Sequence, residues 1–128
     1  MRKTEIIQRL EELNFDPNQY WVITGGAMVL YGIREETGDV DLGCTSDLAD
    51  TLEAQGYPVS VQQDGTRKLT IGEDVEIFEN WLYDSVQLVE GFPVISLEGL
   101  VEMKQHLGRE KDFRDIRLIE RYLSASES

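Results

Sequence analysis

The segment Asp39-Val40-Asp41-Leu42 limits the folds open to this chain more than any other part of the sequence. Successive side chains of a β-strand point to opposite faces, so Asp39 and Asp41 would share one face while Val40, Leu42 and Cys44 share the other. Two carboxylates side by side repel each other, and a hard cation such as Mg²⁺ can bridge them together with substrate phosphates. The segment therefore predicts a strand with one apolar face and one metal-binding face. A pair of aspartates on an edge strand that faces water is the alternative.

A third carboxylate follows the same pattern. In Val75-Glu76-Ile77 the two apolar residues would point away from Glu76, so this segment also reads as a strand with a polar face. If the two strands lie side by side, Asp39, Asp41 and Glu76 converge. Three carboxylates suit phosphoryl transfer by two metal ions, in which one metal activates the attacking oxygen and the other stabilises the leaving pyrophosphate.

The pair Gly25-Gly26 adds a phosphate-binding feature. It lies between the short apolar run 21–24 and a helix predicted to end near Tyr31. Glycines at such a junction allow close approach of the backbone, and the first turn of a helix offers free N–H groups to a phosphate. An ordinary tight turn is the alternative for the pair taken alone.

The remaining elements are predicted from hydrophobic periodicity and from turn residues. Ser96 is expected to cap one helix, Gly108 to end it, and a hairpin turn is expected at 72–74. Phe113, Ile116, Ile119 and Leu123 are expected to face inward on the last helix. Helices are predicted at 4–13, 27–31, 46–56, 97–107 and 110–123, and strands at 21–24, 39–44, 67–71, 75–79 and 93–95. This order predicts an α/β (α+β) fold with one small mixed sheet flanked by helices.

The bulk composition is that of one globular domain over residues 1–128, with a disordered polar tail from Ser124 to Ser128. A single cysteine, Cys44, excludes an intramolecular disulfide, and together with His106 it cannot form a zinc site. We find no signal sequence or membrane-spanning stretch, and we expect a cytoplasmic protein without a membrane partner. The net charge of −13 makes unaided non-specific nucleic-acid binding unexpected.

Taken together, the ordered motifs resemble the nucleotidyltransferase superfamily, the group related to DNA polymerase beta. Its signature is a Gly-Gly or Gly-Ser turn, an Asp-x-Asp pair about a dozen residues later, and a third acidic residue on a neighbouring strand. The form Arg34-x-x-Thr37-x-Asp39-x-Asp41 resembles the branch that includes toxin–antitoxin and antibiotic nucleotidyltransferases. The stretch from Lys104 to Ile116 resembles the K-x(4)-R-x-K-D-x-x-D segment of that branch. Gly26 stands where many members have serine, and Glu76 where aspartate is frequent.

This resemblance implies transfer of a nucleoside monophosphate from an NTP, with Mg²⁺ or Mn²⁺ held by Asp39, Asp41 and Glu76. It further implies that Gly25 and Gly26 bind phosphate through the backbone, and that Lys104 and Lys111 contact the triphosphate. Arg34 and Thr37 would order their loop or contact phosphate. For Lys104 and Lys111 a solvated helix face with a Lys111–Asp115 ion pair is the alternative, and for Arg109 we prefer that solvated face. For Asp112 we prefer a surface or interhelix salt bridge.

The sequence does not identify the acceptor substrate. The acceptor could be a small molecule, a tRNA or a protein with a free hydroxyl or phosphate. A non-catalytic or partner-dependent nucleotide-binding module, such as an antitoxin-like or regulatory subunit, is the second hypothesis. It would act through a protein partner or a homodimer.

Overall fold

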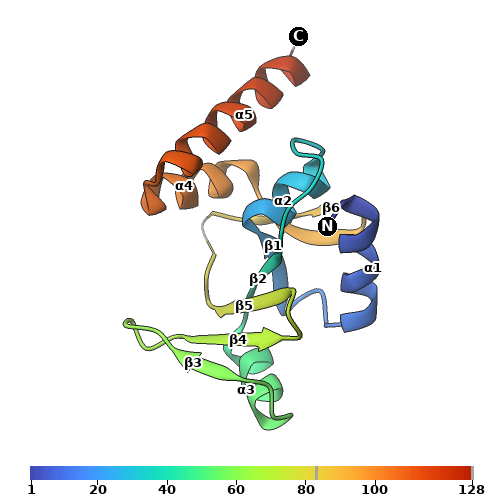
Figure 1. Ribbon diagram of the computed structural model, residues 1–128, viewed down its shortest axis with the longest axis vertical. Coiled ribbons are helices and arrows are strands. Elements are labelled where there is room, and N and C mark those ends of the chain that lie inside the picture. The colour runs from blue at the N-terminus through green and yellow to red at the C-terminus, as the bar shows by residue number, and fades with distance from the viewer. Residues whose placement is uncertain (83, 128) are drawn as a thin grey trace.

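The computed structural model describes residues 1–82 and 84–127 as a layered arrangement of helices and strands (Figure 1). Its helices are α1 (Lys3–Leu13), α2 (Thr24–Tyr31), α3 (Ser46–Ala54), α4 (Leu97–Leu107) and α5 (Glu110–Glu127). Its strands are β1 (Tyr20–Ile23), β2 (Val40–Cys44), β3 (Val59–Val61), β4 (Arg67–Ile71), β5 (Val75–Glu79), β6 (Val86–Val89) and β7 (Phe92–Ile95). In the view of Figure 1, α3 lies at the bottom, α1 at the right, and α5 projects upward from α4.

Within these residues the strands form one seven-stranded sheet in the order β3-β4-β5-β2-β1-β7-β6. Strand β2 pairs in parallel with β5 and antiparallel with β1, while β1 pairs in parallel with β7. The predicted mixed sheet flanked by helices is therefore confirmed. Because β2 lies in the middle of the sheet, Asp41 does not belong to an edge strand.

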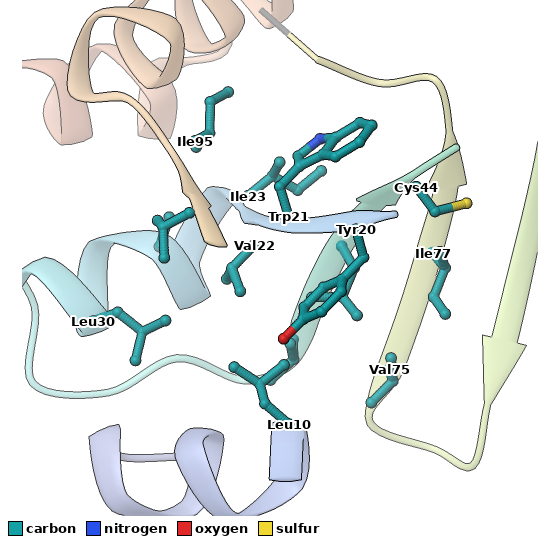
Figure 2. Close-up of a cluster of buried hydrophobic side chains, with 14 of the residues drawn as sticks. Leu10, Tyr20, Trp21, Val22, Ile23, Leu30, Cys44, Val75, Ile77 and Ile95 are labelled. Atoms are coloured by element: carbon teal, nitrogen blue, oxygen red, sulfur yellow. The ribbon is translucent and has the colours of Figure 1, made fainter. Parts of the chain in front are cut away.

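One face of the central strands forms the main core. Val40, Leu42 and Cys44 of β2 are fully buried, as the alternating pattern predicted, and burial raises the pKa of the Cys44 thiol to about 12. Figure 2 shows the buried cluster around β1, with Tyr20 beside Leu10 of α1 and Trp21 on the opposite side of the strand. The site described below lies on the Trp21 side, where the pairing of β1, β2 and β5 places Asp41 and Glu76.

Several predicted boundaries shift by a residue or more. Strand β1 begins at Tyr20 and ends at Ile23, so Thr24 is the first residue of α2, and both glycines lie inside the helix. Asp39 precedes β2, which begins at Val40. The cap of α3 is Thr45, whose hydroxyl accepts a hydrogen bond from the backbone N–H of Leu48 at 3.3 Å. Strands β3 and β6 are additional to the predicted set.

The prediction for α5 needs correction at both ends. Phe113 is 49% exposed, and the inward position is taken by Asp112, which is fully buried. Ile116 and Ile119 are buried as predicted. The helix continues to Glu127, so the predicted tail from Ser124 is helical up to that residue, and Ser128 lies outside the described residues. Over the described part of the chain, no helix combines the length and the apolar character needed to cross a membrane.

Candidate active site

The parallel pairing of β2 with β5 brings two of the predicted carboxylates together. Asp41 lies directly opposite Glu76 in the strand register, while Leu42 and Ile77 form the next pair and point into the core. Asp39 lies just before β2 and is exposed. The prediction that the strands of Asp41 and Glu76 are neighbours is confirmed.

Asp41 is the carboxylate most affected by its surroundings. Its partial burial raises the pKa, and the negative charges of Glu76 and Asp39 raise it further. A hydrogen bond from the Thr24 hydroxyl to Asp41 Oδ2 at 2.8 Å, together with the positive charge of Lys68, acts in the opposite direction. The net effect is a carboxylate that gains from a nearby cation, because a cation would offset both the desolvation and the like-charge repulsion.

The junction of β1 and α2 holds Thr24 in a strained conformation. Its φ of 52° lies in the left-handed region, which is unfavourable for a β-branched residue. Strain of this kind is retained where the surrounding structure imposes it, and it is frequent at functional sites. The helix start has no side-chain cap, because its N-cap position is Ile23. Within the described part of the chain, the first N–H groups of α2 therefore have no capping side chain as an acceptor.

The two glycines have different surroundings. An added Cβ at Gly25 would lie 2.3 Å from the hydroxyl oxygen of Thr37, so only glycine fits beside that side chain. Gly26 is buried, and an added Cβ there would lie 3.3 Å from Val22 in the core. Gly25 lines the cavity described next, whereas Gly26 allows α2 to pack closely on the sheet.

A cavity of about 630 Å³ opens between the carboxylates and the helices α4 and α5. The sheet side contributes Asp39 and Asp41 together with Thr24 and Gly25, and the loop before β2 contributes Arg34, Thr37 and Gly38. The helical side is lined by Lys104, Arg109, Lys111, Asp112, Arg114, Asp115 and Leu118. The cavity therefore joins all the predicted site residues except Gly26 and Glu76.

The charged residues on the helical side are mostly paired with each other. Lys104 is 4% exposed, and its Nζ lies 2.9 Å from Asp115 Oδ2. Arg34 approaches the same carboxylate at 3.9 Å, which connects the loop before β2 to α5. Among the residues that the structure describes, Lys111 forms no ion pair, so the alternative Lys111–Asp115 pair is not formed.

Arg109 and Asp112 form a local ion pair, so Asp112 has the salt bridge that we preferred for it, whereas Arg109 is paired and not simply solvated. Asp112 accepts hydrogen bonds from Arg109 Nε at 2.7 Å, from its Nη2 at 3.1 Å and from its backbone N–H at 3.1 Å. Burial alone would raise the pKa of Asp112, but the bonds from Arg109 and the nearby charge of Lys104 outweigh burial and lower it. Asp112 is therefore an ionised anchor that holds the start of α5 against α4.

Two contributors to the site were not singled out from the sequence. Thr24 bonds to Asp41, and Lys68 of β4 lies 3.5 Å from Glu76 Oε2. Only the pairing of β4 with β5 places Lys68 on the carboxylate face, so no local signal marks it. The position of Thr24 directly before the glycine pair was the available signal for its role.

Among known proteins, no family profile and no curated protein sequence matches this chain. Among solved structures, ANT(2″)-Ia in complex with adenylyl-2″-tobramycin has a TM-score of 0.58 at 20% identity, covering 95% of this chain and 87% of that one. A Thermotoga maritima protein assigned as a nucleotidyltransferase has a TM-score of 0.60 at 19% identity, covering 98% and 96%.

The lincosamide antibiotic adenylyltransferase LnuA with bound lincomycin has a TM-score of 0.56 at 17% identity, covering 91% of this chain and 93% of that one. These similarities extend over nearly the whole length of both partners. At such low identity they concern the fold and not the reaction. The chain has the nucleotidyltransferase fold.

Proposed function

We propose that the protein transfers a nucleoside monophosphate from an NTP to a hydroxyl or phosphate acceptor and releases pyrophosphate. The observation that carries this proposal is the cavity in which Asp39 and Asp41 face the start of α2 on one side and cationic side chains on the other. A triphosphate needs both carboxylate-bound cations and positive side chains around it. The nucleotidyltransferase fold of the chain agrees with this assignment.

The carboxylates fit a divalent cation of the Mg²⁺ or Mn²⁺ type. Mg²⁺ is commonly bound by one or two carboxylates and completed by substrate phosphates and water. Asp41 has the chemistry of such a ligand, because its charge is partly desolvated beside two other acidic groups. When bound, the cation would neutralise charge on the transferring phosphoryl group and make the acceptor oxygen a better nucleophile.

Of the three predicted carboxylates, Glu76 is the one whose role as a metal ligand has the least support. Among residues 1–82 and 84–127, no three acidic, histidine or cysteine side chains are arranged as a ready metal-binding group. Glu76 instead forms an ion pair with Lys68. We propose that Asp39 and Asp41 hold the cation with the triphosphate, and that Glu76 acts on the acceptor side, where it favours loss of the acceptor proton.

The remaining residues position the nucleotide. The backbone N–H groups at the start of α2 near Gly25 bind phosphate oxygens, and Arg34 adds positive charge beside Gly25. Lys104 and Lys111 add positive charge from the helical wall. The acceptor oxygen forms a bond to the α-phosphorus, and the bond from that phosphorus to the bridging oxygen of pyrophosphate breaks. The acceptor proton leaves through Glu76 to solvent.

Thermal unfolding with Mg²⁺ or Mn²⁺ and each of the four NTPs tests this proposal. We expect at least one metal–NTP pair to raise the melting temperature, and we expect the Asp39→Asn, Asp41→Asn variant to lose that rise. The Glu11→Gln, Glu73→Gln variant is the matched control, because it removes the same charge from two exposed positions. No rise with any pair in the folded wild-type protein would overturn the proposal.

Turnover is measured separately as pyrophosphate release in the presence of acceptor mixtures. Release that depends on both Asp39 and Asp41 supports the transfer reaction. Metal-dependent nucleotide binding without release under any condition would instead favour the non-catalytic binding module.

A further inference from the structure

A second cavity, of about 520 Å³, lies beyond Glu76 on the same side of the sheet. It is bounded by the tip of the β3–β4 hairpin, the end of β5 and the last turn of α4. Its lining includes Gln62, Gln63, Thr66, Phe78, Trp81 and His106. In Figure 1 the hairpin tip extends to the left, below the end of α4 that carries residue 106.

Strand geometry connects this cavity to the carboxylates. Phe78 follows Glu76 by two positions on β5, so both side chains point to the same face, and their Cα atoms are about 7 Å apart. The side chains of Val75, Ile77 and Glu79 point to the opposite face of β5 and are buried, which fixes this orientation. A bound compound with a single ring beside Phe78 would therefore be long enough to reach the carboxylates of Asp41 and Glu76.

The floor of the cavity is a pair of stacked aromatic rings. The centroids of Phe78 and Trp81 are 5.3 Å apart, with an angle of 28° between the ring planes. The backbone carbonyl of Trp81 accepts a 2.7 Å hydrogen bond from the indole Nε1 of Trp21, which ties this segment to β1. The Trp21 ring lies over Gly43, where an added Cβ would be 1.9 Å from Nε1. The aromatic floor is thus anchored on the sheet.

The charge of this cavity differs from that of the first one. The described residues that line it include no lysine or arginine, whereas the first cavity has five such side chains. Its one carboxylate, Asp64, is already bonded to the hydroxyl of Thr66 at 2.6 Å and to its backbone N–H at 3.0 Å. The side-chain amides of Gln62 and Gln63 offer both donors and acceptors. This chemistry suits an uncharged ring and disfavours an anion.

We propose that this second cavity is the acceptor subsite, and that it takes an uncharged, ring-bearing hydroxyl compound. The ring stacks on Phe78 and Trp81, and a hydroxyl on its far side reaches Asp41 and Glu76. The inference rests on the proposed nucleotide transfer for its catalytic meaning, but the ring-binding site is tested without it. Gln62, Gln63 and Thr66 would select among acceptors through their polar groups.

The test uses the uniformly ¹⁵N-labelled protein and three uncharged probes: benzyl alcohol, phenyl β-D-glucoside and thymidine. We expect at least one probe at about 10 mM, suited to millimolar affinity, to shift the Trp81 indole signal and the side-chain amides of Gln62 and Gln63. The anionic counterparts benzoate and phenyl β-D-glucuronide should produce shifts at least about tenfold smaller. Trp81→Phe assigns the indole signal.

The variant Phe78→Leu keeps apolar volume but removes the flat ring, and we expect it to abolish the shifts. Phe113→Leu, which changes an exposed aromatic residue on α5, is the control that should retain them. Absence of shifts with all three probes, or equal binding of the anionic counterparts, overturns the inference. Shifts that survive in a folded Phe78→Leu protein overturn it as well.

The outcome is separable from that of the proposed function. Metal–NTP stabilisation without ring binding would leave nucleotide transfer in place and remove this subsite. Ring binding at Phe78 and Trp81 without any metal–NTP stabilisation would leave a ring-binding site and remove the transferase proposal. If both bind, the probe that shifts Trp81 most should also give the largest pyrophosphate release, and equal release with sorbitol, an open-chain polyol, would contradict the acceptor role.

Discussion

The hydroxyl of Thr24 donates a 2.8 Å hydrogen bond to Asp41 Oδ2, which joins the start of α2 to the start of β2. This bond is made by a residue at a φ of 52°, so the chain retains backbone strain at the point where it contacts the partly desolvated carboxylate of Asp41. The bond orients one oxygen of Asp41 and leaves the other for a cation.

Replacing Thr24 by valine should therefore weaken metal-dependent nucleotide binding by about ten- to a hundredfold, since a hydrogen bond to a charged group contributes about 1.5–3 kcal/mol. Valine keeps the β-branched shape and removes the donor. Because that donor lowers the pKa of Asp41, its loss should also move the acid limb of the activity profile to higher pH. Titration calorimetry and a pH–rate profile measure the two effects. Thr24→Ser, which keeps the hydroxyl, should retain both properties, and equal losses in both variants would contradict this role.

Asp41→Asn should stabilise the metal-free protein while removing its response to metal and nucleotide. The folded protein raises the pKa of Asp41, so ionisation of Asp41 opposes folding, and stability falls as pH rises from 3.8 toward the raised folded value. At neutral pH the asparagine variant avoids this cost and still accepts the bond from Thr24. We expect a melting temperature higher by roughly 1–4 °C.

Scanning calorimetry without metal checks this gain, and the exposed replacement Glu73→Gln is the control for a change of net charge alone. A metal-free Asp41→Asn protein that melts at or below the wild-type temperature would show that Asp41 is not strained by its surroundings. A similar gain in Glu73→Gln would assign the effect to net charge.

Gly25→Ala should disturb the loop before β2, because the new Cβ would lie 2.3 Å from the hydroxyl oxygen of Thr37. We expect a loss of about 1–3 kcal/mol from overpacking, together with weaker nucleotide binding. Thr37→Ala in the same chain removes that oxygen and should recover most of the stability. Urea unfolding of the single and double variants measures the coupling. Additive losses in the double variant would show that the two side chains do not compete for this space.

Much of this arrangement follows from local sequence patterns. The alternation in β2 placed Val40, Leu42 and Cys44 in the core, and Ser96 and Gly108 marked the two ends of α4. Such signals are local, because strand alternation and helix caps depend on residues a few positions apart. The edge strands β3 and β6 lack an alternation of buried and exposed side chains. Their residues are mostly exposed, and Leu88 of β6 is 74% exposed, so apolar side chains there do not report a buried face.

The misjudged face of α5 has a specific cause. Phe113, Ile116, Ile119 and Leu123 have helical spacing, but Asp112 lies equally well on that face and is the residue that is buried. Burying a carboxylate is costly unless it is paired. Arg109 pairs with Asp112 locally, but the charge of Lys104 approaches it only once α4 and α5 meet. The adjacency of Asp41 to Glu76 and of Glu76 to Lys68 likewise depends on strand pairing between distant segments.

A last prediction concerns the ion pair that holds α3 to the sheet on the face opposite the site. Arg67 bonds to Glu79 Oε2 at 2.6 Å and to Asp50 of α3 at 2.8 Å, and Glu79 is 7% exposed. The hydrogen bonds from Arg67 lower the pKa of Glu79 to about 2. Glu79→Gln should cost about 3 kcal/mol near neutral pH, because it leaves Arg67 without its most buried partner.

The stability that Glu79 contributes should depend on pH. A carboxyl whose folded pKa is depressed contributes stability above its unfolded pKa of 4.5, and that contribution is lost as pH falls toward about 2. Urea unfolding between these limits should therefore show the wild-type protein converging on Glu79→Gln as the solution becomes more acidic. Asp47→Asn changes an exposed carboxylate on α3, the helix that carries Asp50. Its free energy of unfolding should vary with pH in parallel with that of the wild type. A constant gap between wild type and Glu79→Gln down to the lower limit would mean that Glu79 stabilises the fold by its shape and hydrogen bonds, and not by its charge.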